Sequence, residues 1–287
     1  MTPQVVCVGD NVVDLYVDEG IGFPGGNAVN VAVHATRLGT TMGRPPAAYV
    51  GVLGDDEAGR HVLAALEDEA VDLTRSRVVA GANAFARGRL INGDRVFLPG
   101  SIGVSEFVPD AADLALVATS HITHTGECSM LEPHLAALSD AAQFLSFDFS
   151  ERDWDYVADY AQFADLAILS RPASSPEDPL EVANKVLALG APQVVVSSGV
   201  SGALWADGSR HVWAQAPDAD VVDTLGAGDS LIARLLMGLA TAQTPEIFLP
   251  AATAYATASC MTRGAFGNSF SFDPQSIGSA IPSNPTP

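Results

Sequence analysis

The segment from Asp223 to Ser230 carries the residue types that phosphate chemistry needs. It reads Asp-Thr-Leu-Gly-Ala-Gly-Asp-Ser, so two carboxylates flank a turn of small residues. Glycine lets a backbone turn sharply and approach a ligand closely. The apolar run 231–237 predicts a buried helix directly afterwards, and the free N–H groups of a helix N-terminus attract an anion. The segment therefore predicts a phosphate turn, with Asp229 in reach of a hydroxyl. A simpler interpretation is a tight turn with Asp229 or Ser230 as N-cap.

A second segment, Gly-Gly-Asn-Ala-Val-Asn at 25–30, suits the other half of such a reaction. Its glycines, Gly25 and Gly26, precede a predicted helix. Asn27 and Asn30 are one turn apart and therefore share a face. Two amides on one face can bind neighbouring hydroxyls of a polyol. The alternative is that Asn27 is an N-cap and Asn30 a tolerated polar residue of the helix.

The first apolar run, 5–8, ends in the polar residues Asp10 and Asn11. Such a run predicts a buried parallel strand. Ligands bind at the carboxyl ends of strands in open α/β sheets, so both residues are candidates for substrate binding. Asp14 follows on a predicted exposed strand.

Strands and helices alternate in the second half of the chain. Strands are predicted at 121–124, 144–149, 165–169 and 194–197, and helices at about 130–142, 153–162 and 178–189. Together with strands at 5–8 and 48–52, and further helices at 27–39, 57–69, 231–237 and 246–262, this alternation predicts a mainly parallel sheet.

Two hairpins interrupt this pattern. The Asn92-Gly93 turn predicts one between 85 and 98, and Asp207-Gly208 predicts another. We expect residues 12–24 and 84–107 to form a small β-layer that acts as a lid. Arg87 and Arg89 would point the same way on its strand. Gly199 and Gly202 follow the strand at 194–197, where a backbone can approach a nucleotide.

Composition excludes several classes of protein. A net charge of −20 over 287 residues argues against a broad nucleic-acid surface. No run of about 18 apolar residues predicts a membrane span, and no basic start predicts a signal peptide. Three scattered cysteines are typical of reduced core thiols, so we expect a cytoplasmic protein.

Other motifs are missing as well. The sole lysine, Lys185, lies in no GxxxxGK[ST] pattern, which rules out a P-loop. No G-x-G-x-x-G follows the first strand, which argues against a dinucleotide oxidoreductase. His121 and His124 have an odd spacing, so on a strand they face opposite sides and do not suit a shared metal.

Three motifs together resemble the ribokinase-like, or PfkB, family of carbohydrate kinases. They are the segment 25–30, the pattern Gly51-x-x-Gly54-x-Asp56-x-x-Gly59 and the segment 223–229. The resemblance covers residues 4–267. It implies a three-layer α/β/α kinase domain over 1–267 with a mainly parallel central sheet and a small β-sheet lid. Composition predicts that the tail 268–287 is in part disordered. Lids of this kind present flat apolar faces, so we expect a homodimer that forms through the lid.

The resemblance implies roles for the residues above. Asp229 would be the base, and the N–H groups of Gly226, Ala227 and Gly228 would form the anion hole for the γ-phosphoryl group of ATP. Asp223 matches a position linked to a monovalent cation, here K⁺. Sugar hydroxyls would be bound by Asp10, Asn11, Asp14, Gly25, Gly26, Asn27 and Asn30. The nucleotide side would comprise Ser197, Gly199, Gly202, Thr224, Gly226 and Gly228.

Within the family the chain resembles most the fructoselysine 6-kinases, on segments 9–14, 27–33, 94–97 and 147–150. The resemblance implies an ATP-dependent kinase that phosphorylates a fructosamine such as fructoselysine at C6. The carboxylate of this substrate could meet Arg87, Arg89 or Arg95. The alternatives are another sugar or nucleoside kinase, and a catalytically silent sugar-binding regulatory protein. Residues 98–102 depart from the subfamily pattern and are candidates to line the substrate site.

The chain departs from the family at the magnesium motif. An Asn-x-x-Glu is expected after the strand that ends near Leu169, but the chain reads Ser-Arg-Pro-Ala-Ser-Ser at 170–175. Either nucleotide and water hold Mg²⁺ with less help from the protein, or Glu177 substitutes through water.

Overall fold

The computed structural model describes residues 2–91, 94–172 and 174–273, except for the side chains of 89–97. Its body is a sheet in the order β14-β13-β12-β11-β10-β9-β1-β4. All neighbours from β12 to β4 are parallel, and the β12–β13 and β13–β14 pairs are antiparallel. The predicted parallel sheet and the hairpin at Asp207-Gly208 are confirmed. The strands are β1 (Val5–Val8), β4 (Ala48–Val50), β9 (Ile122–Gly126), β10 (Leu145–Asp148), β11 (Leu166–Ser170), β12 (Gln193–Ser197), β13 (Ala203–Ala206) and β14 (His211–Ala214).

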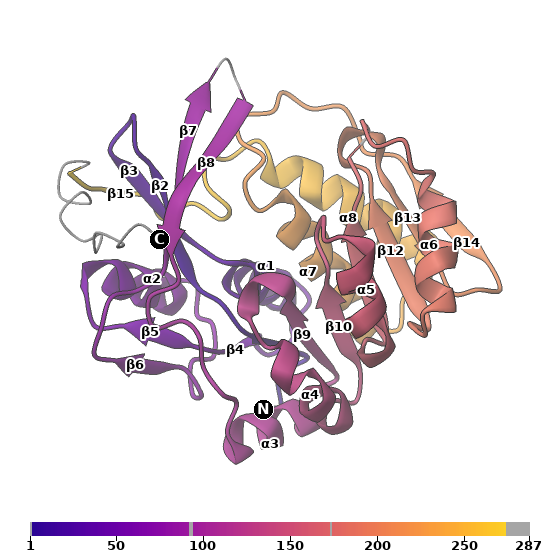
Figure 1. Cartoon of the computed structure of the whole chain (residues 1–287), viewed down its shortest axis with the longest axis horizontal. Helices are drawn as coiled ribbons and strands as arrows, with labels where there is room; N and C mark the ends of the chain where they lie inside the picture. Colours follow the sequence, from indigo (N-terminus) through magenta and orange to yellow (C-terminus); the bar gives the residue numbers. More distant parts are fainter. Residues whose placement is uncertain (1, 92–93, 173, 274–287) are drawn as a thin grey trace, which may run out of the picture.

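Helices cover both faces of this sheet (Figure 1). One face carries α1 (Asn27–Thr41), α7 (Ala227–Ala240) and α8 (Pro245–Ser259), and the other carries α3 (Ala111–Thr119), α4 (Leu135–Ala141), α5 (Trp154–Tyr160) and α6 (Pro179–Ala188). Side chains alternate across a strand. Val5 of β1 accordingly packs in the core beneath α1 and α7, whereas Val6 packs in the core beneath α3 and α4. The three-layer prediction is confirmed.

A second sheet rises from one end of the body (Figure 1). Its order is β15-β3-β2-β7-β8, with β2 (Val12–Tyr16), β3 (Ile21–Gly25), β7 (Phe85–Ile91), β8 (Asp94–Ser101) and β15 (Phe270–Ser271). The ranges expected for the lid, 12–24 and 84–107, contain β2, β7 and β8 in full and all of β3 except Gly25. β15 comes from the tail, where Phe270 stacks on His61 with ring centroids 4.0 Å apart. The predicted Asn92-Gly93 turn and the tail beyond 273 lie outside the described residues.

The predicted strand 48–52 is split at Gly51. β4 joins the main sheet, whereas β5 (Val52–Gly54) pairs with β6 (Arg77–Val79) and is followed by α2 (Glu57–Asp68). A Cβ on Gly51 would lie 2.1 Å from the Tyr49 hydroxyl and 2.6 Å from the Gly9 carbonyl oxygen. The backbone therefore bends here in a space that only glycine fits.

The predicted helix 130–142 begins later than expected. Two 3-10 turns, η1 (Glu127–Ser129) and η2 (Glu132–His134), precede α4. Met130 adopts a left-handed conformation with φ 53°, and Pro133 has no N–H to donate, so an α-helix cannot run through them. Two further 3-10 turns are η3 (Ala161–Phe163) and η4 (Gly199–Ser201).

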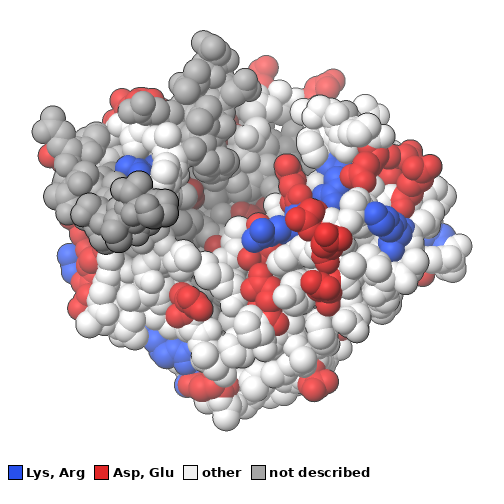
Figure 2. Space-filling view, viewed as in Figure 1, with Lys and Arg blue, Asp and Glu red and all other residues white. Residues whose placement is uncertain are grey.

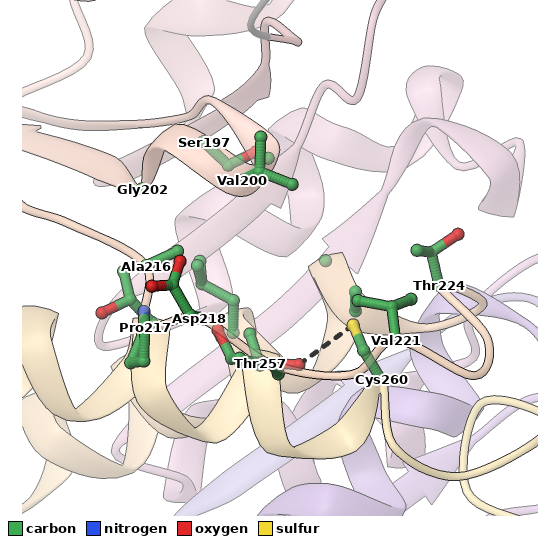
Figure 3. Close-up of a pocket in the computed structure, with 17 residues that line it drawn as sticks. Ser197, Val200, Gly202, Ala216, Pro217, Asp218, Val221, Thr224, Thr257 and Cys260 are labelled. Carbon is green, nitrogen blue, oxygen red and sulfur yellow. Dashed lines mark hydrogen bonds between the residues drawn. The ribbon is translucent and has the colours of Figure 1, made fainter.

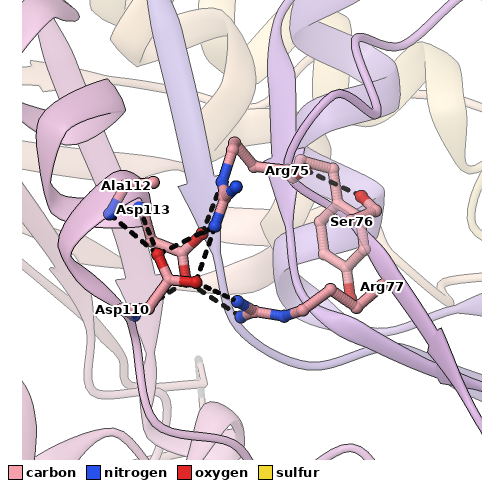
Figure 4. Close-up of polar contacts among 7 residues, drawn as sticks. Arg75, Ser76, Arg77, Asp110, Ala112 and Asp113 are labelled. Carbon is pink, nitrogen blue, oxygen red and sulfur yellow. Dashed lines mark hydrogen bonds and ion pairs between the residues drawn. The ribbon is translucent and has the colours of Figure 1, made fainter.

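The helix α3 was not among the predicted elements. Its N-terminus is a capping box in which the side chains of Asp110 and Asp113 each accept the backbone N–H of the other residue. Asp113 is buried, and ion pairs join the two carboxylates to Arg75 and Arg77 (Figure 4). This network fastens α3 to β6 and to the chain before it. None of the described helices has both the length and the hydropathy needed to span a bilayer.

Candidate active site

The carboxylate of Asp10, at the end of β1, caps helix α1. Its oxygens accept the backbone N–H groups of Asn27 at 3.0 Å and Ala28 at 3.3 Å, and the Ser129 hydroxyl donates to it at 3.0 Å. The N-cap residue is Gly26, with φ 106°, and a Cβ there would lie 2.9 Å from Asp10 Oδ2. The interpretation of Asn27 as N-cap is therefore wrong. Its side chain points instead to a cluster of carboxylates.

Asn27 and Asn30 both donate to Asp229. Asn27 Nδ2 lies 2.8 Å from Asp229 Oδ1, and Asn30 Nδ2 lies 2.6 Å from Asp229 Oδ2. Asn27 Nδ2 also lies 3.0 Å from Asp148 Oδ2, at the end of β10. The predicted shared face of the two asparagines thus meets the predicted base.

His124 fixes the orientation of the Asn27 amide. Its Nε2 lies 3.1 Å from Asn27 Oδ1, and its Nδ1 lies 3.2 Å from Ser146 Oγ. An amide oxygen only accepts, so Nε2 carries the proton and Nδ1 accepts from the serine. Burial lowers the pKa of His124 to about 3, which keeps the ring neutral. His121, by contrast, is exposed.

The acceptor carboxylates hold their protons more tightly than free ones. Burial raises the pKa of Asp229 to about 6, against the opposing effect of the two asparagine hydrogen bonds. Burial also raises the pKa of Asp148 to about 7, and the charge of Asp229 contributes to this rise. At neutral pH Asp229 is mostly ionised and close to its pKa, which suits a group that accepts a proton.

Asp14 and Asn11, two other residues predicted to bind the sugar, lie in different surroundings. A Cβ on Gly25 would lie 2.5 Å from Asp14 Oδ2 and 3.6 Å from Asn30 Oδ1, so Asp14 lies beside Asn30. Asn11 is fully buried, and its Nδ2 donates to the Val52 carbonyl oxygen at 2.6 Å. The structure therefore brings Asp14 to the cluster, whereas Asn11 anchors β5.

The turn before α7 is the predicted anion site, here called the anion turn. Gly226 is the N-cap with φ 72°, and a Cβ there would lie 2.5 Å from the Cβ of Ala265. Asp229 lies in the first turn of the helix, where the first N–H groups have no intrahelical partner. The Ala227 N–H donates to the Thr224 carbonyl oxygen at 3.2 Å. The interpretation of Asp229 or Ser230 as N-cap is wrong.

A pocket of about 320 Å³ opens against this turn (Figure 3). Its walls come from η4, the chain 216–221, α7 and α8. It is lined by five predicted nucleotide residues, namely Ser197, Gly199, Gly202, Thr224 and Gly228. The predicted nucleotide residues did not include Ala256 and Thr257 of α8, or Cys260 directly after it, because an alanine-rich apolar helix gives no signal for a ligand.

Asp223 links the turn to the lid. Its Oδ2 accepts from the Tyr16 hydroxyl at 2.7 Å and from the Gly264 N–H at 3.0 Å, and its Oδ1 accepts from the Leu225 N–H at 3.1 Å. Tyr16 ends β2, so the lid and the anion turn share a buried hydrogen bond.

The residues that stand where the family has its magnesium motif form hydrogen bonds with one another. Glu177 Oε1 accepts from Trp154 Nε1 and Oε2 accepts from Arg171 Nε, each at 3.0 Å. Within the described residues no three His, Cys, Asp or Glu side chains gather as a metal site. Both carboxylate oxygens of Glu177 are thus engaged, and its role as a substitute ligand for Mg²⁺ through water stays a prediction.

The predicted arginines lie on the lid. Arg87 Nε donates to the Pro99 carbonyl oxygen at 2.6 Å. Arg89 and Arg95 belong to β7 and β8, but their side chains lie outside the described part of the chain. Asp148 was missed as a site residue, although it ends its strand as Asp10 nearly does, and this position is the available signal.

A family model described as pfkB family carbohydrate kinase matches residues 4–269. The chain belongs to the pfkB family. It is 34% identical over 283 residues to fructosamine kinase FrlD of Bacillus subtilis, covering 96% of this chain and 98% of that protein. It is also 34% identical over 254 residues to fructoselysine 6-kinase of Escherichia coli, covering 88% and 93%. Both predicted resemblances are confirmed.

The fold of this pfkB protein matches solved structures of other kinases. The Arabidopsis thaliana ribokinase complexed with ribose and ATP superposes with a TM-score of 0.77 at 20% identity, covering 97% of this chain and 98% of that one. The predicted ribokinase-like fold is confirmed. By its family the chain is an ATP-dependent carbohydrate kinase.

Proposed function

We propose that the protein transfers the γ-phosphoryl group of Mg-ATP to the C6 hydroxyl of a fructosamine such as fructoselysine. One observation carries the proposal. Asp229, held by Asn27 and Asn30, lies in the same helical turn as Ala227 and Gly228, which line the neighbouring pocket. A base and a phosphate site in one turn bring acceptor and donor together.

The residues of this turn divide the chemistry between them. The acceptor hydroxyl gives its proton to the carboxylate of Asp229 while its oxygen forms the bond to the γ-phosphorus and ADP leaves. The N–H groups of Gly226 and Gly228 face the charge that develops on the phosphoryl group, whereas the Ala227 N–H already donates to the Thr224 carbonyl oxygen. The two asparagines orient the carboxylate and favour its ionised form. Mg²⁺ enters as part of the nucleotide substrate.

The surrounding carboxylates suit a substrate that carries many hydroxyls and a protonated amine. Asp10, Asp14 and Asp148 all lie near the asparagines that bind Asp229. Carboxylates accept hydrogen bonds from sugar hydroxyls and also attract an ammonium group. The fructosamine kinase from Bacillus subtilis, alignable over nearly the whole chain, supports the same substrate class.

Two finer proposals accompany this one. K⁺ would act at Asp223, whose carboxylate holds the start of the anion turn. A homodimer would form through the lid at β8, because β15 covers the opposite edge at β3. Activity with K⁺ against Na⁺ tests the first, and sedimentation velocity tests the second.

A substrate panel tests the main proposal. ADP release is measured with fructoselysine, fructose, ribose and nucleosides, and the product is mapped by phosphorus-coupled NMR. We expect fructoselysine to give the highest kcat/KM and a phosphate on C6. Equal rates with plain sugars would show that the chain is another kind of sugar kinase, and a preference for nucleosides would show a nucleoside kinase.

A further inference from the structure

Arg152 and Glu127 form an ion pair beside the proposed acceptor site. Arg152 Nε donates to Glu127 Oε2 at 2.8 Å. Glu127 directly follows β9, and Arg152 lies in the turn after β10. These two strands are parallel neighbours, so their carboxyl ends meet at one edge of the sheet. The pair therefore shares this edge with Asp148.

Glu127 is in electrostatic reach of the acceptor carboxylates. Its charge contributes, after burial and the charge of Asp229, to the raised pKa of Asp148. The Cys128 thiol donates to Glu127 Oε1 at 3.1 Å, and burial together with the charge of Asp10 raises the pKa of this thiol. Arg152 thus pairs with a residue, Glu127, that borders the site proposed to bind the sugar.

Arg152 keeps donors available. In the part of the chain that the structure describes, only its Nε forms a side-chain hydrogen bond, which leaves both Nη groups. The side chain is 49% exposed, whereas that of Glu127 is 15% exposed. Its guanidinium lies over the Tyr156 ring, 4.9 Å from the centroid. Glu127 and Tyr156 therefore hold a planar cation at the rim with its outer donors unused.

Other cations near this edge are already engaged. Arg171 is 8% exposed and donates to Glu177 and to three backbone carbonyls. Lys185 Nζ lies 3.3 Å from the centroid of the Trp154 ring. Figure 2 shows acidic and basic side chains gathered over α5 and α6, beside a hollow in this face.

We propose that Arg152, oriented by Glu127, binds the carboxylate of the amino-acid part of the fructosamine. This inference rests on the proposed function. With C6 at Asp229, the sugar lies among carboxylates that repel a substrate carboxylate, and a cation must offset that repulsion. The two Nη groups of a guanidinium suit a carboxylate. The substrate carboxylate is then bound at the edge of the main sheet, and the arginines of the lid do not bind it.

Three substrates test the proposal in Arg152→Ala. They are fructose, the fructosamine of propylamine, which has no carboxylate, and fructosyl-glycine, which has one. We expect kcat/KM for fructosyl-glycine to fall ~10- to 100-fold, mainly through KM, because one charge-assisted contact is lost. The propylamine compound should change by less than about twofold. Arg152→Lys should recover part of the loss, and Glu127→Gln should show the same selectivity in weaker form.

Arg210→Ala is the matched control. Arg210 is also half-exposed, pairs with Glu246 at 2.9 Å and lies over the Trp205 ring, but it belongs to the hairpin of β13 and β14. It should leave all three substrates unchanged. Thermal unfolding and the KM for ATP should match the wild type in both alanine variants.

Each contrary outcome has one meaning. An equal loss on all three substrates, a raised KM for ATP, or a selective loss in Arg87→Ala with none in Arg152→Ala would each overturn the role of Arg152. A wild-type enzyme that prefers fructose to both fructosamines would instead overturn the proposed function. A wild type that prefers fructosyl-glycine, together with an unaffected Arg152→Ala, leaves the function standing and removes this inference alone.

Discussion

Asn30 Nδ2 lies 2.6 Å from Asp229 Oδ2, although 199 residues separate them along the chain. Asn30 lies in the first turn of α1, and Asp229 lies in the first turn of α7. The two helix N-termini therefore meet at one carboxylate. Packing of α1 against α7 therefore decides how Asp229, the proposed base, is oriented.

Asp229→Asn should lower kcat by ~10²- to 10⁴-fold, the usual contribution of a positioned base. The amide is isosteric but cannot take the proton of the hydroxyl. ATP binding, followed by fluorescence or calorimetry, should stay within about threefold of the wild type, because the N–H groups of the turn are unchanged. Activity that survives this substitution would remove Asp229 from the role of base.

The pH dependence of kcat/KM should show an acid limb. The base must be ionised, and the pKa of Asp229 is about 6. At saturating Mg-ATP, kcat/KM for the sugar should therefore rise with pH and level off above about pH 7. Initial rates between pH 5 and 8 measure this. A flat profile in the wild type, with unchanged stability over that range, would contradict the assignment.

Asp148→Asn should stabilise the protein at alkaline pH. The pKa of Asp148 rises from 3.8 unfolded to about 7 folded, so folding favours its protonated form. Its stabilising effect is complete below pH 4 and is lost as the pH rises through 7. Asparagine removes that pH-dependent loss, which is on the order of 4 kcal/mol at pH 8.

Thermal unfolding at pH 4.5 and pH 8 measures this difference. The melting temperature of Asp148→Asn should exceed that of the wild type at pH 8, and the gap should shrink at pH 4.5. Asp159→Asn is the control, because Asp159 is exposed. An equal difference in melting temperature at both pH values would show that burial does not raise the pKa of Asp148.

Tyr16→Phe should destabilise the protein by about 1–2 kcal/mol, because the buried Asp223 loses a hydrogen bond to a charged acceptor. Chemical unfolding measures the loss. Tyr160→Phe is the control, since the hydroxyl of Tyr160 has no partner among the described residues. Equal stability of the two variants would mean that the hydrogen bond between lid and turn contributes nothing.

Gly226→Ala should lower kcat/KM by ~100-fold or more, because the turn must move to admit the new methyl group. The Cβ would lie 2.5 Å from that of Ala265, and φ is 72°. Gly43→Ala separates the two causes, since Gly43 has φ 66° but nothing within 4 Å. It should cost on the order of 1 kcal/mol of stability and no activity. Normal turnover in Gly226→Ala would argue against the anion turn.

The sequence predicted the strands of the main sheet well. Burial on two faces gives a continuous apolar run, and burial on one face gives an alternation bounded by turn residues. It predicted less well where one residue changes the path of the chain. Gly51 splits a strand where the Tyr49 hydroxyl and the Gly9 carbonyl oxygen leave no room for a Cβ, and the left-handed conformation of Met130 delays a helix. The α3 helix was missed, although its Asp110–Asp113 capping box is visible in the sequence.

By itself, the sequence determined the chemistry of the site. The segments 25–30 and 223–230 supply the amides, glycines and carboxylate of the proposed site. Their turns and helix N-termini could be predicted because such local structure depends on residues that are near in the sequence. Only the tertiary structure decided which of these groups touch. It turned Asn11 inward, brought Asp148 and His124 to Asn27, and joined Tyr16 to Asp223. These contacts depend on how layers pack across the sheet, and no local pattern encodes that packing.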